Sequence, residues 1–172
     1  NKIDELLLTT NGTQLAKYAS TLSHLGVKRI NVSLDSLISE KFKFITNGGK
    51  LDQILEGIFL AREKNISIKI NTVLLNKFND DEIIPIMEWC AKNKFKLSFI
   101  EVMPIGEVSS SRSLQYLSVK TAKEIISKKF ELVDSSLKSS GPSSYFFCKK
   151  LNSYVGFISP ISDHFCLTCN RI

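Results

Sequence analysis

The chain reads Arg29-Ile30-Asn31-Val32-Ser33-Leu34-Asp35 at the point that decides its fold. The apolar residues of this run, Ile30, Val32 and Leu34, stand at even positions. Its polar residues stand at odd positions. Because successive side chains of a strand point to opposite faces, the run predicts a strand with one apolar and one polar face. Parallel strands that are covered on both faces read as continuous apolar runs instead. One side of the predicted sheet is therefore polar.

Strand and helix signals alternate on both sides of this run. Strands are predicted at residues 5–10, 29–34, 67–74 and 96–102. Amphipathic helices are predicted at residues 14–25 and 51–64, and a third begins after Asn79, which we expect to cap it in a capping box with Glu82. The turn pair Asn11-Gly12, Gly26 and Asn65 punctuate the elements. Strands alternating with helices form right-handed parallel units, so we predict an α/β fold, a partial (β/α) TIM-like barrel.

The pattern changes after Met103. A polar, Ser-rich loop is predicted first, then a helix that Ser118 caps and that runs to Lys129, and then an antiparallel pair at residues 144–147 and 154–158. We predict two parts. Residues 1–106 form the middle of the barrel, and residues 107–172 form a late barrel helix and the start of a C-terminal region.

Polar residues also occur where the predicted strands end, as in Thr9-Thr10-Asn11 and Glu101-Val102-Met103. Polar groups at the carboxyl ends of parallel strands are typical of a barrel active site. Lys69 lies inside a strand, on the polar parity, and would be costly to bury without an anionic partner. The alternative is a sheet with one solvent-exposed face. We regard it as the weaker interpretation, because helices lie between all the predicted strands and must pack against the sheet. We therefore favour an active site on the polar face.

Composition excludes several classes of protein. The 172 residues are 43% hydrophobic and carry a net charge of +6, with no apolar run long enough to cross a bilayer. We interpret Lys123, Lys128 and Lys129 as solvated helix faces, because no basic run is interleaved with aromatics as in a nucleic-acid platform. The start lacks an initiator Met and a targeting signal, so we interpret the chain as part of a longer protein. The four unevenly spaced cysteines favour a reducing compartment.

Two cysteines close the chain in the run His164-Phe165-Cys166-Leu167-Thr168-Cys169-Asn170-Arg171-Ile172. Thiolates at this spacing can bind one metal centre. The pair follows a loop, which disfavours a thioredoxin-like motif. A zinc site that adds Cys148 or His164 stays open. Cys90 lies next to Trp89 on a helix, and we expect it to be an ordinary core thiol.

Five blocks in order resemble the GTP 3′,8-cyclase family of radical SAM enzymes, which starts molybdenum cofactor (molybdopterin) biosynthesis. They are residues 8–12, 30–36, 68–73, 99–106 and 165–171, and residues 141–143 and 156–160 also look like family blocks. The resemblance covers nearly the whole chain and includes the Cys-x-x-Cys-Asn-Arg ending. It implies a radical SAM barrel whose C-terminal extension carries a second cluster-binding motif.

The resemblance also implies the chemistry. In that family a first [4Fe–4S] cluster cleaves S-adenosyl-L-methionine to a radical that takes a hydrogen from the GTP ribose, and the ribose then closes onto the guanine. The product is (8S)-3′,8-cyclo-7,8-dihydroguanosine 5′-triphosphate. A second [4Fe–4S] cluster holds the purine. The implied roles are S-adenosylmethionine binding for Ser33 and Met103, GTP binding for Thr9, Lys69 and Arg171, and ligation of the second cluster for Cys166 and Cys169.

The chain departs from the family pattern in what it lacks. It contains neither the CxxxCxxC motif of the radical-generating cluster, nor the glycine-rich stretch expected before Leu8, nor the third ligand of the second cluster. We therefore assign no catalytic residue within the chain. We expect the 172 residues alone to be inactive, and turnover of GTP by this segment would contradict that expectation.

Three other interpretations stay open at this point. They are another radical SAM enzyme with an auxiliary cluster, a zinc-stabilised interaction module, and a barrel enzyme without iron. For the parent protein the resemblance implies GTP as substrate and a cyclic pyranopterin monophosphate synthase acting on its product, and it is compatible with a homodimer. We expect neither a nucleic acid nor a membrane as partner. We expect the parent protein to be located in a bacterial cytoplasm or, in a eukaryote, in an organelle.

Overall fold

The structure is a computed structural model that describes residues 5–103, 115–137 and 142–162. The chain divides into two compact units, residues 1–71 and residues 72–172, which are described one at a time. Across the described ranges, no helix combines the length and the apolarity that spanning a membrane would need.

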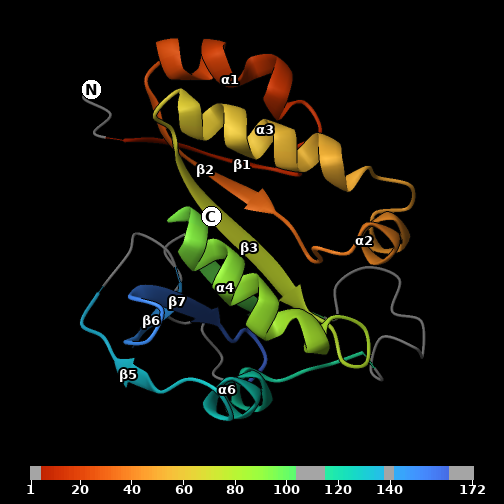
Figure 1. Cartoon of the computed structure of the whole chain (residues 1–172), viewed down its shortest axis with the longest axis vertical. Coiled ribbons are helices and arrows are strands. Elements are labelled where there is room, and N and C mark those ends of the chain that lie inside the picture. Colours follow the sequence, from red (N-terminus) through yellow and green to blue (C-terminus); the bar gives the residue numbers. More distant parts are fainter. Residues whose placement is uncertain (1–4, 104–114, 138–141, 163–172) are drawn as a thin grey trace. The chain divides into compact units, whose positions relative to one another are not determined.

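Three strands and three helices make up the first unit (Figure 1). The strands are β1 (Leu6–Thr10), β2 (Val27–Ser33) and β3 (Ser67–Leu74), whose residues up to Asn71 belong to this unit. The strand β2 pairs in parallel with β1 on one side and with β3 on the other, as the alternating pattern predicted. The helices are α1 (Leu15–His24), α2 (Ser39–Ile45) and α3 (Leu51–Glu63), of which the short α2 was not predicted.

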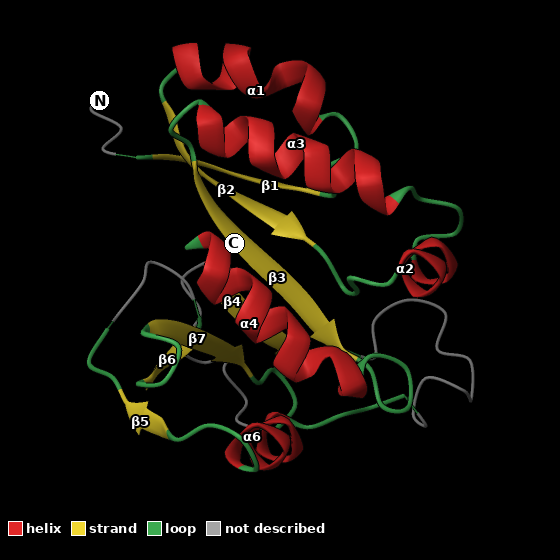
Figure 2. Ribbon diagram, viewed as in Figure 1, coloured by secondary structure: helices red, strands yellow, loops and turns green. Residues whose placement is uncertain are grey.

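The apolar parity of β2 forms the core of this unit. Ile30 and Val32 are buried, and so are Ile68 and Ile70 of β3 on the same face. Figure 2 shows α1 and α3 lying side by side next to these strands. The two helices approach closely at Gly57, where an added Cβ would lie 2.9 Å from the Cβ of Leu15. Burial of this face against two helices leaves the opposite, polar face of the strands for other contacts.

Glycine is required where β1 turns into α1. Gly12 has a φ of +82°, as predicted for the Asn11-Gly12 turn, and an added Cβ would lie 2.8 Å from Cγ2 of Ile54 and 3.3 Å from Cγ1 of Val32. Gly26, which ends the turn after α1, has a φ of +80° but no atom within 4 Å of an added Cβ. The two glycines therefore share a backbone conformation and differ in the space around them.

This difference predicts that alanine at Gly12 and alanine at Gly26 destabilise the fold by different amounts. Gly12→Ala lowers the free energy of unfolding by about 2–4 kcal/mol, because backbone strain adds to overpacking of the core. Gly26→Ala, the control, loses only the backbone part, about 1–2 kcal/mol. Urea unfolding followed by circular dichroism measures both. Equal losses for the two variants would show that Ile54 and Val32 move aside at no cost.

The second unit contains a parallel strand pair extended by antiparallel strands. Its described elements after β3 are η1 (Asp80–Glu82), α4 (Ile83–Asn93), β4 (Lys96–Glu101), α6 (Val119–Ser127), β5 (Leu132–Asp134), β6 (Ser144–Cys148) and β7 (Ser153–Ile158). The strand β7 pairs in parallel with β4 and antiparallel with β6, and β6 pairs antiparallel with β5. The predicted hairpin at residues 144–158 is confirmed, and in addition it joins the sheet through β4.

The helix caps follow the predictions only in part. Ser118 caps α6 as predicted, and its side chain accepts a hydrogen bond from the Thr121 amide at 3.1 Å. The prediction for Asn79 was wrong, since neither η1 nor α4 has a side-chain cap hydrogen bond. The Asn79 side chain instead accepts from the Leu75 amide at 2.8 Å and donates to the Val73 carbonyl at 2.9 Å. Because both polar atoms of this side chain bind backbone groups at the end of β3, the side chain does not cap the helix that follows.

Candidate functional site

The polar face of the first unit brings together residues from all three strands. Thr9 of β1 lies beside Asn31 of β2, and Asn31 lies beside Lys69 of β3 in the register of the sheet. Residues paired in adjacent parallel strands share a face, so these three side chains form one row across the strands. Ser33 pairs with Asn71 in the same register and forms the next row toward the carboxyl ends. We call these five residues the polar rows.

Burial within the polar rows is uneven. Asn31 and Lys69 are only 6% and 8% exposed, whereas Thr9 and Ser33, at the ends of the rows, are exposed. A lysine and an amide this deeply buried normally have specific partners, because desolvating them is unfavourable. The rows thus combine a buried cation with exposed hydroxyl groups, and such a set of groups suits a ligand that is anionic and carries hydroxyls.

Hydrogen bonding leaves part of the rows unsatisfied. The Asn31 amide nitrogen donates to the Thr9 hydroxyl at 3.4 Å, a long hydrogen bond. Among the described residues, Oδ1 of Asn31 and Oδ1 of Asn71 are buried and find no hydrogen-bond partner, and the same holds for Nε of Arg29, which precedes Asn31 on the same parity. Buried polar groups are nearly always paired. The orphaned acceptors are what a face that binds a ligand with N–H or O–H donors would contain, so the residues present fit such a ligand.

Thr9 also lines a small pocket of about 220 Å³ at the β1 edge. The rest of its lining is mostly apolar and comes from β1, α1 and β2: Leu8, Thr10, Gln14, Leu15, Tyr18, Leu22 and Ile30. The predicted apolar face of α1 is therefore only partly buried, and Tyr18 stays 44% exposed.

In the second unit, Met103 follows β4 and is exposed. Glu101, two residues earlier, is buried and accepts four hydrogen bonds. Its Oε1 accepts from the Val119 amide at 2.8 Å and the Ser162 hydroxyl at 2.7 Å, and its Oε2 accepts from the amides of Ile161 and Ser162 at 3.2 and 3.1 Å. The sequence placed Glu101 among the polar strand ends of an active site, but the structure uses its carboxylate to join β4 to the start of α6 and to the segment after β7.

The pKa of Glu101 reflects this environment. Burial raises the pKa of the carboxyl, but the hydrogen bonds from Val119, Ser162 and Ile161 outweigh burial and hold the pKa below the ordinary value of 4.5. The charged form is thus the one that the folded protein stabilises.

The cysteines inside the described ranges are core residues. Cys90 is buried on α4, and burial raises the pKa of its thiol, as expected for a core thiol. Cys148 is fully buried in β6. Among the residues that the structure describes, no group of three or more metal-ligating side chains occurs. Cys166, Cys169, Arg171 and His164 lie outside the described residues, so their predicted roles stay predictions.

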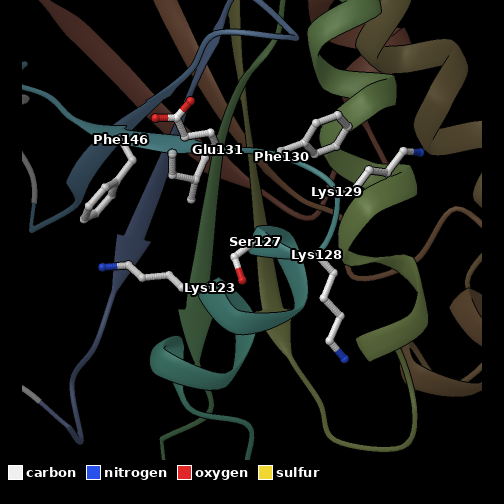
Figure 3. A pocket seen from close by; sticks show the side chains of 8 residues that line it. Lys123, Ser127, Lys128, Lys129, Phe130, Glu131 and Phe146 are labelled. Carbon is white, nitrogen blue, oxygen red and sulfur yellow. The ribbon is translucent and has the colours of Figure 1, made fainter.

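The three lysines of the α6 end line a surface pocket of about 520 Å³ but do not converge in it (Figure 3). Lys123 lies over the ring of Phe146, with its Nζ 3.8 Å from the ring centroid, and Lys129 forms an ion pair of 2.6 Å with Glu88. Figure 3 shows Lys128 pointing away from Lys123. This divergence agrees with the interpretation of these lysines as surface side chains and gives no focus for an anion.

Sequence reasoning identified the polar parity of these strands but assigned no role to Asn31 or Asn71. Their alternation with apolar residues was the available signal. It could not show that Asn31 lies between Thr9 and Lys69, because register between strands is set by pairing and not by local pattern.

Two family models match the chain. One describes the Radical SAM superfamily and matches residues 1–90, and the other describes Molybdenum Cofactor Synthesis C and matches residues 95–172. Curated relatives include the GTP 3′,8-cyclase of Bradyrhizobium diazoefficiens, which is 44% identical over 170 residues, 99% of this chain and 49% of that protein. The enzyme of Paracoccus denitrificans is 42% identical over 99% of this chain and 50% of its own length. The chain thus spans about half the length of the curated relatives it matches.

A solved structure, native anSMEcpe with bound AdoMet, is similar in fold. The TM-score is 0.56 at 17% identity, over 72% of this chain and 35% of that one. At this identity the likeness shows the fold alone, a mixed α/β fold that is consistent with the predicted partial (β/α) barrel. The assignment to a family rests on the sequence matches. The chain belongs to the radical SAM superfamily, and it is similar to GTP 3′,8-cyclases over almost its entire length.

Proposed function

We propose that the protein containing this chain is a radical SAM GTP 3′,8-cyclase of molybdenum cofactor biosynthesis, which converts GTP to (8S)-3′,8-cyclo-7,8-dihydroguanosine 5′-triphosphate. The observation that carries the proposal is the identity of 44% with a curated GTP 3′,8-cyclase over 99% of this chain. The match of residues 95–172 to the Molybdenum Cofactor Synthesis C model supports it, since that part lies outside the Radical SAM match.

The polar rows support a nucleotide as ligand. Lys69 provides a cation for the phosphates, and Thr9, in the same row, provides a hydroxyl that can donate or accept. Ser33, one row further toward the carboxyl ends, is assigned to S-adenosylmethionine together with Met103. In this proposal the first unit holds the GTP phosphates by charge and orients the nucleotide by hydrogen bonds from short side chains on rigid strands.

Members of the radical SAM superfamily use S-adenosylmethionine and a [4Fe–4S] cluster, which when bound supply a 5′-deoxyadenosyl radical. We assign Cys166 and Cys169 as ligands of a second [4Fe–4S] cluster and Arg171 as a GTP contact. The division into a barrel part at residues 1–106 and a cluster-binding part at residues 107–172 belongs to the same proposal. We further propose that a cyclic pyranopterin monophosphate synthase consumes the product.

The test is anaerobic purification of the full-length protein, with iron and acid-labile sulfide measured before and after reconstitution. We expect two clusters per chain and, with S-adenosylmethionine, GTP and a reductant, formation of 5′-deoxyadenosine together with the cyclised nucleotide, seen by liquid chromatography and mass spectrometry. Zinc without sulfide would support an interaction module instead. Formation of 5′-deoxyadenosine that responds to a peptide and not to GTP would support a different radical SAM enzyme.

A further inference from the structure

We infer that Asn31 binds the GTP molecule directly, through its amide oxygen, and contributes to nucleotide specificity. This inference rests on the proposed function and adds to it a residue that carries no assigned role. Its starting point is the geometry of β2, which places Asn31 in the middle of the row between Thr9 and Lys69, the two residues assigned to GTP.

The side chain of Asn31 is buried and incompletely bonded. It is 6% exposed, its nitrogen makes the long bond of 3.4 Å to Thr9, and its oxygen has no partner among the residues that the structure describes. Rotating the amide by half a turn would not remedy this, since Thr9 would then face the oxygen and leave the nitrogen unpaired. Within the part of the chain that the structure describes, one polar atom of Asn31 is therefore left without a partner.

A contrasting residue shows what a structural asparagine looks like in the same chain. Asn79 is 1% exposed, and its oxygen and nitrogen are both bonded to backbone groups, at 2.8 and 2.9 Å. In the described ranges, Asn31 makes no comparable hydrogen bond to the backbone. Both side chains are thus buried, while their hydrogen bonding differs, and this difference points to a ligand for Asn31.

The chemistry of the missing partner follows from the acceptor. An amide oxygen accepts from N–H or O–H and does not bind phosphate. GTP carries such donors on its ribose and on the guanine edge, while its phosphates suit Lys69. Asn71 offers a second unpartnered oxygen on the same face, beside Ser33. S-adenosylmethionine also carries hydroxyl and amino donors, but the shared row of Asn31 with Thr9 and Lys69 favours GTP.

The experiment compares Asn31→Ala with Asn79→Ala in the full-length reconstituted protein. Isothermal titration measures binding of GTP and of S-adenosylmethionine, and thermal unfolding without ligand measures stability. For Asn31→Ala we expect GTP binding about tenfold weaker, or about 1.4 kcal/mol, with S-adenosylmethionine binding and the melting temperature unchanged. For Asn79→Ala we expect unchanged GTP binding and a melting temperature lower by about 2–10 °C.

Unchanged GTP binding with a lower melting temperature for Asn31→Ala would overturn the inference and make Asn31 structural. Weaker binding of S-adenosylmethionine alone would overturn the assignment to GTP. If the unaltered protein itself binds no GTP, the proposed function fails and the inference fails with it. If the unaltered protein binds GTP and Asn31→Ala binds it equally well, the inference alone fails.

Discussion

Replacing Glu101 with alanine lowers the free energy of unfolding by about 3–5 kcal/mol, because removing a buried charged acceptor leaves its donors unpaired. Four donors lose their partner: the amides of Val119, Ile161 and Ser162 and the Ser162 hydroxyl. The start of α6 and the segment after β7 both lose their link to β4. Urea unfolding of the protein, followed by circular dichroism, measures the change.

Glu88→Ala is the matched control. Glu88 lies in the same unit and makes an ion pair of 2.6 Å with Lys129, but both side chains are more than 40% exposed. Solvent-exposed ion pairs contribute about 0–1 kcal/mol, so this variant should unfold almost like the unaltered protein. A loss below about 1 kcal/mol for Glu101→Ala as well would contradict the structural role of Glu101.

The same carboxylate gives a pH dependence of known sign. Because the pKa of Glu101 is lowered in the folded protein, its contribution to stability is present above the ordinary value of 4.5 and is lost as the pH falls through the folded pKa. Glu101→Gln keeps one oxygen but places an amide nitrogen among donors, so at neutral pH it is less stable than the unaltered protein. The difference in the free energy of unfolding between Glu101→Gln and the unaltered protein should become smaller at acid pH. A difference that becomes larger there would contradict the lowered pKa of Glu101.

Lys69→Met reduces kcat/KM for GTP by about 10- to 150-fold, which corresponds to the 1.5–3 kcal/mol of a hydrogen bond to a charged group. Methionine keeps an apolar side chain of similar length in a site where Lys69 is 8% exposed, so the variant removes the charge with little change in packing. This prediction depends on the proposed function. The measurement is the steady-state rate of cyclised product at several GTP concentrations, with thermal unfolding to confirm that the variant is folded.

Two further variants separate charge from fold. Lys69→Arg keeps the charge and should retain more activity than Lys69→Met. Lys28→Met removes an exposed lysine from β2 and should leave kcat/KM unchanged. If Lys69→Met is folded and as active as the unaltered protein, Lys69 does not bind the GTP phosphates.

Several elements were predictable because their signals are local. The strand at residues 67–74 has the predicted bounds, Gly12, Gly26 and Asn65 have the positive φ expected of turn residues, and Ser118 caps its helix. Asn79 shows the limit of such reasoning. Its position before a helix matched a capping box, but the backbone at the end of β3 competed for the same side chain and bonded both of its polar atoms.

From the sequence by itself, the family, the α/β fold and the polar face with Lys69 were determined. Side-chain parity depends only on the geometry of a single strand, and the family motifs are contiguous runs. The tertiary structure alone decided that Asn31 lies between Thr9 and Lys69, with an oxygen that finds no partner among the described residues. It also decided that the Glu101 carboxylate joins β4 to the start of α6 and to the segment after β7. These features depend on strand register and on contacts such as that of Glu101 with Ser162, 61 residues away. No local pattern encodes pairings at that separation, because they arise only when the chain folds.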